Sequence, residues 1–179
     1  MTSTLKPPMR QLHIAETKTG YQLSDPNSTQ PSFIAIRNTA DPKLSVFTGQ
    51  ATHETADKPF GDITFQTATN EIEIKGNEIS RRVMYRDGHF GNTLMVKGTG
   101  GRWAWKGQTF SSTIKLIDMK SEEQIGCISE GVLSVSNDLE LEYFHAAVLS
   151  GLACVELRHR GKQARNRGLT MIFGWPIGK

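Results

Sequence analysis

Residues 143–157 are apolar or glycine at every position except His145, Ser150 and Glu156. A helix over this stretch is apolar on all sides, and such a helix is buried inside a protein or a membrane. At 1.5 Å per residue it measures about 22 Å, which is shorter than the roughly 30 Å hydrocarbon core of a bilayer. The stretch therefore predicts a helix enclosed by the rest of the chain, over about residues 142–160.

Flanking residues set the expected ends of this helix. We expect a short strand at 139–141 before it, and a stop at Gly161 after a basic last turn. Val148, Leu152 and Val155 are expected to be inaccessible to solvent.

Upstream of the helix, short apolar runs and alternating segments recur between turn residues, as in half-buried strands. These segments are 12–15, 33–36, 44–47, 63–65, 71–75 and 113–117. Because they follow one another at short spacing, we expect an antiparallel meander. The chain is expected to hold one domain over residues 11–168, after a flexible arm at 1–10. The tail at 169–179 is expected to be either a packed strand or loose.

Composition bears on location and partners. The net charge of +3 is too small to indicate a nucleic-acid partner, and none is expected. The first eight residues lack the apolar core of a signal peptide, and no stretch reaches the roughly 18 apolar residues of a membrane span. We therefore expect a cytoplasmic protein, peripheral to membranes at most, in which Cys127 and Cys154 stay reduced.

Residues that usually support catalysis or metal binding have structural explanations here. The five histidines show no metal-ligand spacing, so no metal, cofactor or catalytic residue is predicted. His145 is expected to be a core or rim histidine. The glycine-rich segment 98–101 precedes a strand-like run, which favours a hairpin over a phosphate loop. Trp103 and Trp105 share one strand face, where packing is the commoner use.

Charge is unevenly placed along the chain. Between residues 81 and 115 there are seven basic residues against one acid, and six further basic residues follow Leu157 with no acid among them. If the strands of the first block are adjacent, their basic side chains form a patch for anionic headgroups or phosphates. Equally, these charges could pair with the eight acids of residues 116–157 across the fold.

Four segments resemble parts of a known superfamily. They are Gly-Arg-Trp-Ala-Trp-Lys at 101–106, the strand-like runs 114–118 and 124–128, and the small-residue-rich helix 148–156. Their order, short strands and then one apolar helix, resembles the tubby C-terminal-like superfamily over about residues 60–162. This superfamily includes tubby, the phospholipid scramblases and the LURP-one-like proteins, and the resemblance is strongest to its fungal members.

The resemblance implies a mainly β fold, in which an antiparallel closed barrel wraps around the hydrophobic helix. It also implies a non-enzymatic domain that docks on anionic, phosphoinositide-like lipid, although without a membrane span no scramblase activity is expected. The predicted lipid-binding residues are Arg81, Arg82, Arg86, Arg102 and Lys106, with a second contact at Arg158, Arg160, Lys162 and Arg165.

Two other functions stay open. One is a protein-interaction module without lipid affinity, in which neighbouring acids neutralise the basic block. The other is an enzyme or small-ligand binder at the barrel mouth, which requires converging polar residues that the linear sequence does not display. The sequence does not single out a headgroup, a protein partner or an oligomeric state.

Overall fold

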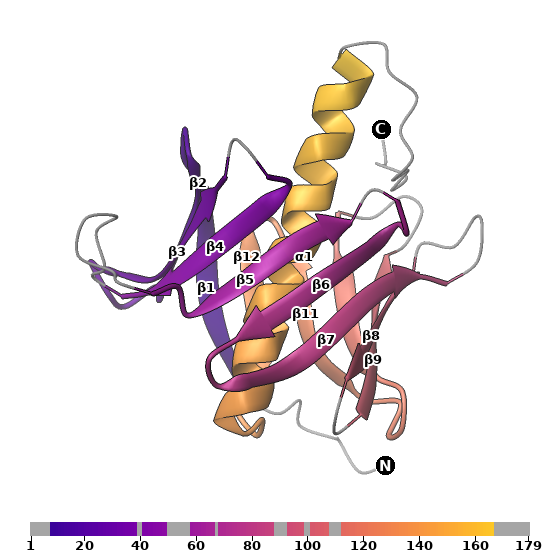
Figure 1. Cartoon of the computed structure of the whole chain (residues 1–179). Coiled ribbons are helices and arrows are strands. Elements are labelled where there is room, and N and C mark those ends of the chain that lie inside the picture. Colours follow the sequence, from indigo (N-terminus) through magenta and orange to yellow (C-terminus); the bar gives the residue numbers. More distant parts are fainter. Residues whose placement is uncertain are drawn as a thin grey trace.

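Antiparallel strands, each paired with the next along the chain, close into a barrel around a single helix (Figure 1). The structure is a computed structural model that describes residues 8–38, 41–49, 58–66, 68–87, 93–98, 101–107 and 112–166. These residues form twelve strands and one α-helix. The strands are β1 (Met9–Glu16), β2 (Gly20–Ser24), β3 (Pro31–Arg37), β4 (Lys43–Thr48), β5 (Gly61–Gln66), β6 (Glu71–Gly76), β7 (Ile79–Arg86), β8 (Thr93–Gly98), β9 (Gly101–Gly107), β10 (Ile114–Asp118), β11 (Gln124–Ser129) and β12 (Val132–Ser136), and the helix is α1 (Leu141–Asn166).

The predicted meander and the predicted closed barrel are both confirmed. The first and last strands complete the ring, with Leu12 of β1 opposite Leu133 of β12. Alternation along each strand points apolar side chains inward, where they meet α1. Ring closure leaves no exposed sheet edge.

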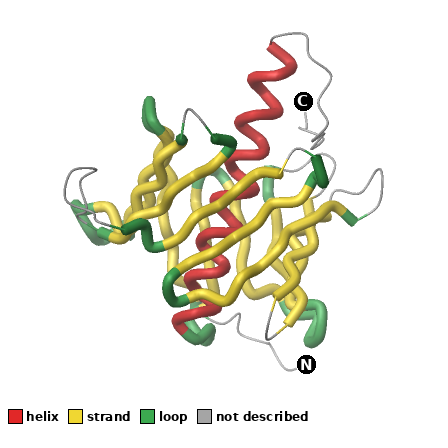
Figure 2. The backbone as a smooth tube through the Cα atoms, in the orientation of Figure 1, coloured by secondary structure: helices red, strands yellow, loops and turns green. Residues whose placement is uncertain are grey.

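Helix α1 runs through the barrel (Figure 2) and packs closely against β5 and β12. A Cβ atom added at Gly61 of β5 would lie 2.6 Å from a methyl carbon of Leu149, and one added at Gly151 would lie 3.1 Å from a methyl carbon of Leu133. Glycine at these two positions therefore allows the wall and the helix to approach closely. On the same helix, Ser150 accepts a 3.0 Å hydrogen bond from the indole N–H of the buried Trp105.

The interior position of the helix is confirmed, but three details were wrong. Val148 and Leu152 are fully buried, whereas Val155 is only half-buried because it faces a pocket described below. Residues 137–140 form a turn rather than the end of a strand, so 139–141 is not a strand. The helix also continues through Gly161 to Asn166, since Gly161 lacks the positive φ that would end it.

The barrel begins within the predicted arm, because Met9 and Arg10 already belong to β1 and pair with Ser136 and Val135. Residues 1–7 and 169–179 lie outside the described residues. The segment 98–101 joins β8 to β9 with Gly98 opposite Gly101, which confirms the hairpin.

Candidate anion-binding surface

The meander divides the basic block of residues 81–115 between the two ends of the barrel. Neighbouring strands run in opposite directions, so β7 ends where β8 begins. We call the end at which α1 starts the N-end, and the end at which α1 leaves the barrel the C-end (Figure 1). The N-end half holds Arg81, Arg82, Lys97 and Arg102, and the C-end half holds Arg86, Lys106 and Lys115.

Alternation along β7 separates the three arginines that were predicted to act together. Arg81 is exposed on the outer face. Arg82 is buried on the inner face, as is Met84 two residues later. Arg86 has the same parity as Arg82 and is half-buried at the C-end. The three therefore do not form one surface patch.

Arg82 is a core residue, with a side chain only 1% exposed. Its guanidinium lies 5.0 Å from the ring centroid of Trp103 and 5.4 Å from that of Tyr143, within the range of cation–π contact. In the described part of the chain, the nearest carboxylate oxygen, on Glu142, is 3.8 Å away, and the buried Nε and Nη2 atoms have no hydrogen-bond partner there. Burial lowers the pKa of Arg82. In this position Arg82 does not reach a lipid surface.

Arg81 is exposed but its charge is paired. Its guanidinium contacts the carboxylate of Glu73, which also lies 3.1 Å from the ammonium of Lys75. Burial of Glu73 opposes ionisation, yet the hydrogen bonds from Lys75 and Arg81 hold the pKa of its carboxyl group below the usual value. Pairing of this kind was the neutralisation expected for a protein-interaction module.

A different set of basic residues converges on the outer face of β8, β9 and β10. Lys97 lies directly opposite Arg102, and Lys106 lies directly opposite Lys115. We call these four residues the basic face. All four are exposed, and within the described ranges none of them forms an ion pair or a side-chain hydrogen bond.

The two basic pairs are separated along the strands by an apolar row. This row is Met95, Ala104 and Ile117, which pair across β8, β9 and β10. Residues directly opposite each other have Cβ atoms about 5 Å apart, and like charges at that distance destabilise a sheet. Because the fold loses stability by these pairings, the basic face is better matched to an external anion than to a structural role.

The residues predicted to form a second lipid contact are largely engaged within the protein. Arg160 is half-buried, pairs with Glu156 at 2.8 Å and lies 4.0 Å from the ring centroid of Phe65, so its charge is already compensated. Arg158 donates a 3.0 Å hydrogen bond to the carbonyl of Ser112, which fixes α1 to the start of β10. Lys162 is exposed and forms no ion pair with any described residue, and the side chain of Arg165 lies outside the described ones.

Glu156, to which the sequence analysis gave no role, anchors the helix at the C-end of the barrel. Its carboxylate is 2% exposed and accepts hydrogen bonds from Tyr21 Oη at 2.8 Å, Arg37 Nε at 2.9 Å and Arg160 Nε at 2.8 Å. Burial opposes its charge, but these three donors hold the pKa of Glu156 below its usual value. Burial and the neighbouring carboxylate raise the pKa of Tyr21.

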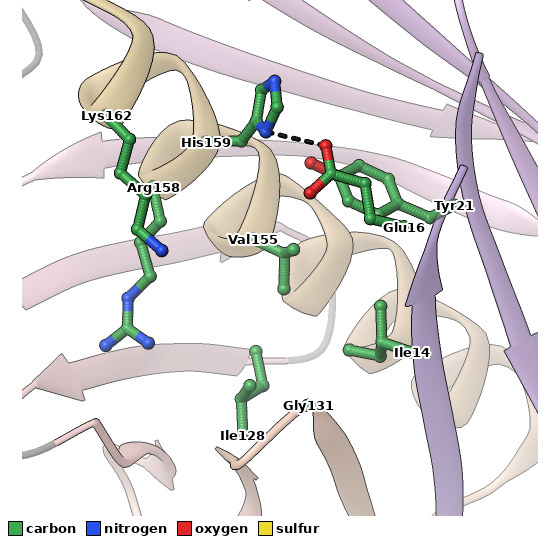
Figure 3. Close-up of a pocket in the computed structure, with 9 residues that line it drawn as sticks. All are labelled: Ile14, Glu16, Tyr21, Ile128, Gly131, Val155, Arg158, His159 and Lys162. Atoms are coloured by element: carbon green, nitrogen blue, oxygen red, sulfur yellow. Dashed lines mark ion pairs between the residues drawn. The ribbon is translucent and has the colours of Figure 1, made fainter. Parts of the chain in front are cut away.

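A pocket of about 260 Å³ opens beside this anchor, between α1 and the ends of β1, β2 and β11 (Figure 3). Arg158 and Lys162 lie on one side of it, and Glu16 and Tyr21 on the other. Its full lining is Ile14, Glu16, Tyr21, Ile128, Gly131, Val155, Arg158, His159 and Lys162. Sequence analysis predicted no such convergence, because Ile14, Glu16 and Tyr21 lie more than a hundred residues before the other lining residues.

The remaining residues of reactive type, His145 and the two cysteines, are explained by packing. His145 is buried among the rings of Phe33, Phe60 and Phe144, its Nδ1 has no hydrogen-bond partner, and burial lowers its pKa. Cys154 is a buried free thiol whose pKa is raised by burial, and Cys127 is a half-buried free thiol. In the part of the chain that the structure describes, no three His, Cys, Asp or Glu side chains are placed to hold a metal ion. Within the described residues, no helix is both long enough and apolar enough to cross a membrane.

No family model matches this chain, and no curated protein or solved structure matches it either. Membership of the tubby C-terminal-like superfamily therefore stays a prediction.

Proposed function

We propose that this protein is a non-enzymatic domain that docks on anionic phospholipid surfaces through the basic face. The observation that carries the proposal is the pairing of Lys97 with Arg102 and of Lys106 with Lys115, four exposed charges without ion-pair partners among the described residues. Arg102 and Lys106 were predicted members of the site. Lys97 and Lys115 take the places of Arg81, Arg82 and Arg86.

The apolar row adds a second element that suits a membrane interface. Met95 and Ile117 are half-buried on either side of the fully buried Ala104, between the two basic pairs, and Met119 is exposed beside Arg102. Apolar side chains flanked by basic ones match the boundary between acyl chains and anionic headgroups.

The expected affinity is low. Each basic residue near an anionic surface contributes about 1 kcal/mol, so four contribute about 4 kcal/mol, which corresponds to a dissociation constant of about 1 mM. Salt shortens the range of these interactions and is expected to abolish binding. The docking is therefore peripheral and reversible.

Cosedimentation with phosphatidylcholine vesicles, with and without phosphatidylinositol 4,5-bisphosphate, tests the proposal at low and at high salt. Wild-type protein is expected to sediment only with the anionic vesicles at low salt. The Lys106→Ala/Lys115→Ala variant is expected to lose most of this binding.

The matched control is Lys18→Ala/Lys58→Ala, which removes two exposed lysines that lie outside β8, β9 and β10. Arg81→Ala serves as a second control, because Arg81 is already paired with Glu73. Both controls are expected to bind like wild type. Absence of binding at low salt, or equal loss in the lysine control, would instead favour a protein-interaction module.

A further inference from the structure

Another pocket opens at the N-end of the barrel, and it includes no residue of the basic face. This pocket, which we call the N-end pocket, measures about 280 Å³. It lies where the end of β12, the turn after it and the first turn of α1 meet the start of β1. Its lining is Arg10, Ser136, Asn137, Leu139, Leu141 and Phe144. Pockets that hold small ligands combine apolar walls with a few polar groups, and this lining has both.

The apolar part of the lining is only partly covered by the protein itself. Leu141, at the start of α1, is 61% exposed, and Leu139, in the preceding turn, is half-buried. Phe144, also on α1, is buried. The apolar part of a ligand that covers Leu139 and Leu141 would remove their surface from water, which is the main favourable contribution to the binding of apolar groups.

The positive charge at the N-end pocket comes from Arg10. This residue has the same parity in β1 as the buried Leu12, so its side chain lies on the inner side of the strand, at the mouth of the barrel. The guanidinium lies 4.7 Å from the ring centroid of Phe144. This cation–π contact positions the guanidinium at the pocket but compensates its charge only in part. None of the ion pairs among the described residues includes Arg10.

The charge balance of the lining favours an anionic ligand. No acidic residue is among the described residues that line the pocket. Asp138 and Glu140 are exposed in the adjoining turn, where water and salt screen their charges. Asn137 is an exposed lining residue that carries amide N–H donors. The pocket therefore offers a guanidinium and an amide to an anion, next to apolar side chains.

We propose that the N-end pocket binds a small carboxylate that carries an apolar chain. The carboxylate contacts the guanidinium of Arg10, whose planar fork can donate two parallel hydrogen bonds to it. The apolar chain lies on Leu139 and Leu141. This site is independent of docking on anionic lipid, because it uses no residue of the basic face.

Titration with hexanoate, followed by the methyl NMR signals of Leu139 and Leu141, tests the proposal with a soluble probe and without vesicles. We expect saturable shifts at both residues. Hexanol, which lacks the charge, and acetate, which lacks the chain, are expected to bind at least about tenfold more weakly, the ratio that corresponds to 1.4 kcal/mol. Equal binding of hexanol or acetate, or no saturable shift with hexanoate, would overturn the proposal.

Arg10→Met separates the charge of Arg10 from its packing. Methionine keeps an apolar side chain over Phe144 but removes the cation, so hexanoate binding is expected to weaken about tenfold or more, while hexanol binds as it does to wild type. The matched control, Arg81→Met, removes an exposed arginine outside the pocket and is expected to bind hexanoate like wild type. Unchanged hexanoate affinity in Arg10→Met, or an equal loss for hexanoate and hexanol, would contradict a carboxylate contact with Arg10.

Leu141→Glu tests the position of the apolar chain. It replaces an exposed apolar side chain with a carboxylate inside the pocket, so hexanoate binding is expected to be lost through both a smaller apolar wall and charge repulsion. Thermal melting is expected to show that the variant stays folded, because the position is exposed. Hexanoate binding by folded Leu141→Glu with wild-type affinity would place the probe elsewhere and overturn the assignment.

Discussion

At the C-end of the barrel, the buried Glu156 carboxylate accepts hydrogen bonds from Tyr21, Arg37 and Arg160, whereas at the N-end the equally buried Arg82 has, among the described residues, no carboxylate nearer than 3.8 Å. Two nitrogen atoms of Arg82 also lack partners, and the aromatic rings around it compensate its charge only in part. A buried charge stabilises a fold only when its hydrogen bonds are satisfied. The comparison therefore indicates that the helix is held mainly at the C-end.

The largest expected effect is the loss of Glu156. Glu156→Ala leaves Arg37 and Arg160 without their buried acceptor, and removal of one partner of a buried ion pair costs about 3–5 kcal/mol. We expect the free energy of unfolding, measured by urea denaturation, to fall by about this amount.

The matched control is Glu16→Gln, which removes another carboxylate partner of Arg37 at a position that is 51% exposed. Surface pairs contribute about 1 kcal/mol or less, so the control is expected to lose no more than that. Equal losses in the two variants would mean that the C-end is not held by Glu156.

The next largest expected effect is a difference between the two ends in how their contribution to stability depends on pH. The folded protein keeps the pKa of His145 below its usual value through burial, so the unfolded chain binds a proton first as the pH falls. Stability from this residue is therefore complete above about pH 6.5 and is lost as the pH falls toward the lowered folded pKa. Glu156, whose pKa is also lowered, loses its contribution only below about pH 4.5.

Urea denaturation between pH 7 and pH 5 measures the first of these losses. In His145→Leu the fall in stability over this range is expected to be smaller than in wild type, because the buried imidazole is gone. The same slope in both proteins would assign the response to other histidines.

The smallest expected effect is at the N-end. Arg82→Met removes a buried cation whose donors are unsatisfied and replaces it with an apolar side chain of similar length. Replacement of a poorly compensated buried charge by an apolar residue is often neutral or stabilising, so we expect a change of about 1 kcal/mol or less, or a gain. A loss similar to that of Glu156→Ala would show that both ends hold the helix equally.

Much of the fold follows from local patterns in the sequence. The apolar stretch at 143–157 has no place except the interior, and period-two segments such as 71–75 predict strands with one wet face. The predicted end of the helix was wrong because Gly161 is an ordinary helical residue. Whether a glycine ends a helix depends on the packing around it and not on the glycine itself.

The site was harder to predict because it depends on strand parity and register. Alternation within β7 is visible in the sequence and could have separated Arg81 from Arg82. The pairing of Lys106 with Lys115 requires the register of β9 and β10, and the contact of Tyr21 with Glu156 requires the closed barrel. Neither is encoded in a short window of residues.

The position of α1 after all twelve strands has a consequence for folding on the ribosome. The apolar walls of the barrel are synthesised before the helix that covers them, and β1 cannot pair with β12 until Val132–Ser136 has emerged. Contacts between residues so far apart in sequence form slowly, because a long loop must be closed first. The nascent chain therefore exposes an open, apolar sheet until α1 has emerged, and during this interval it is prone to aggregation.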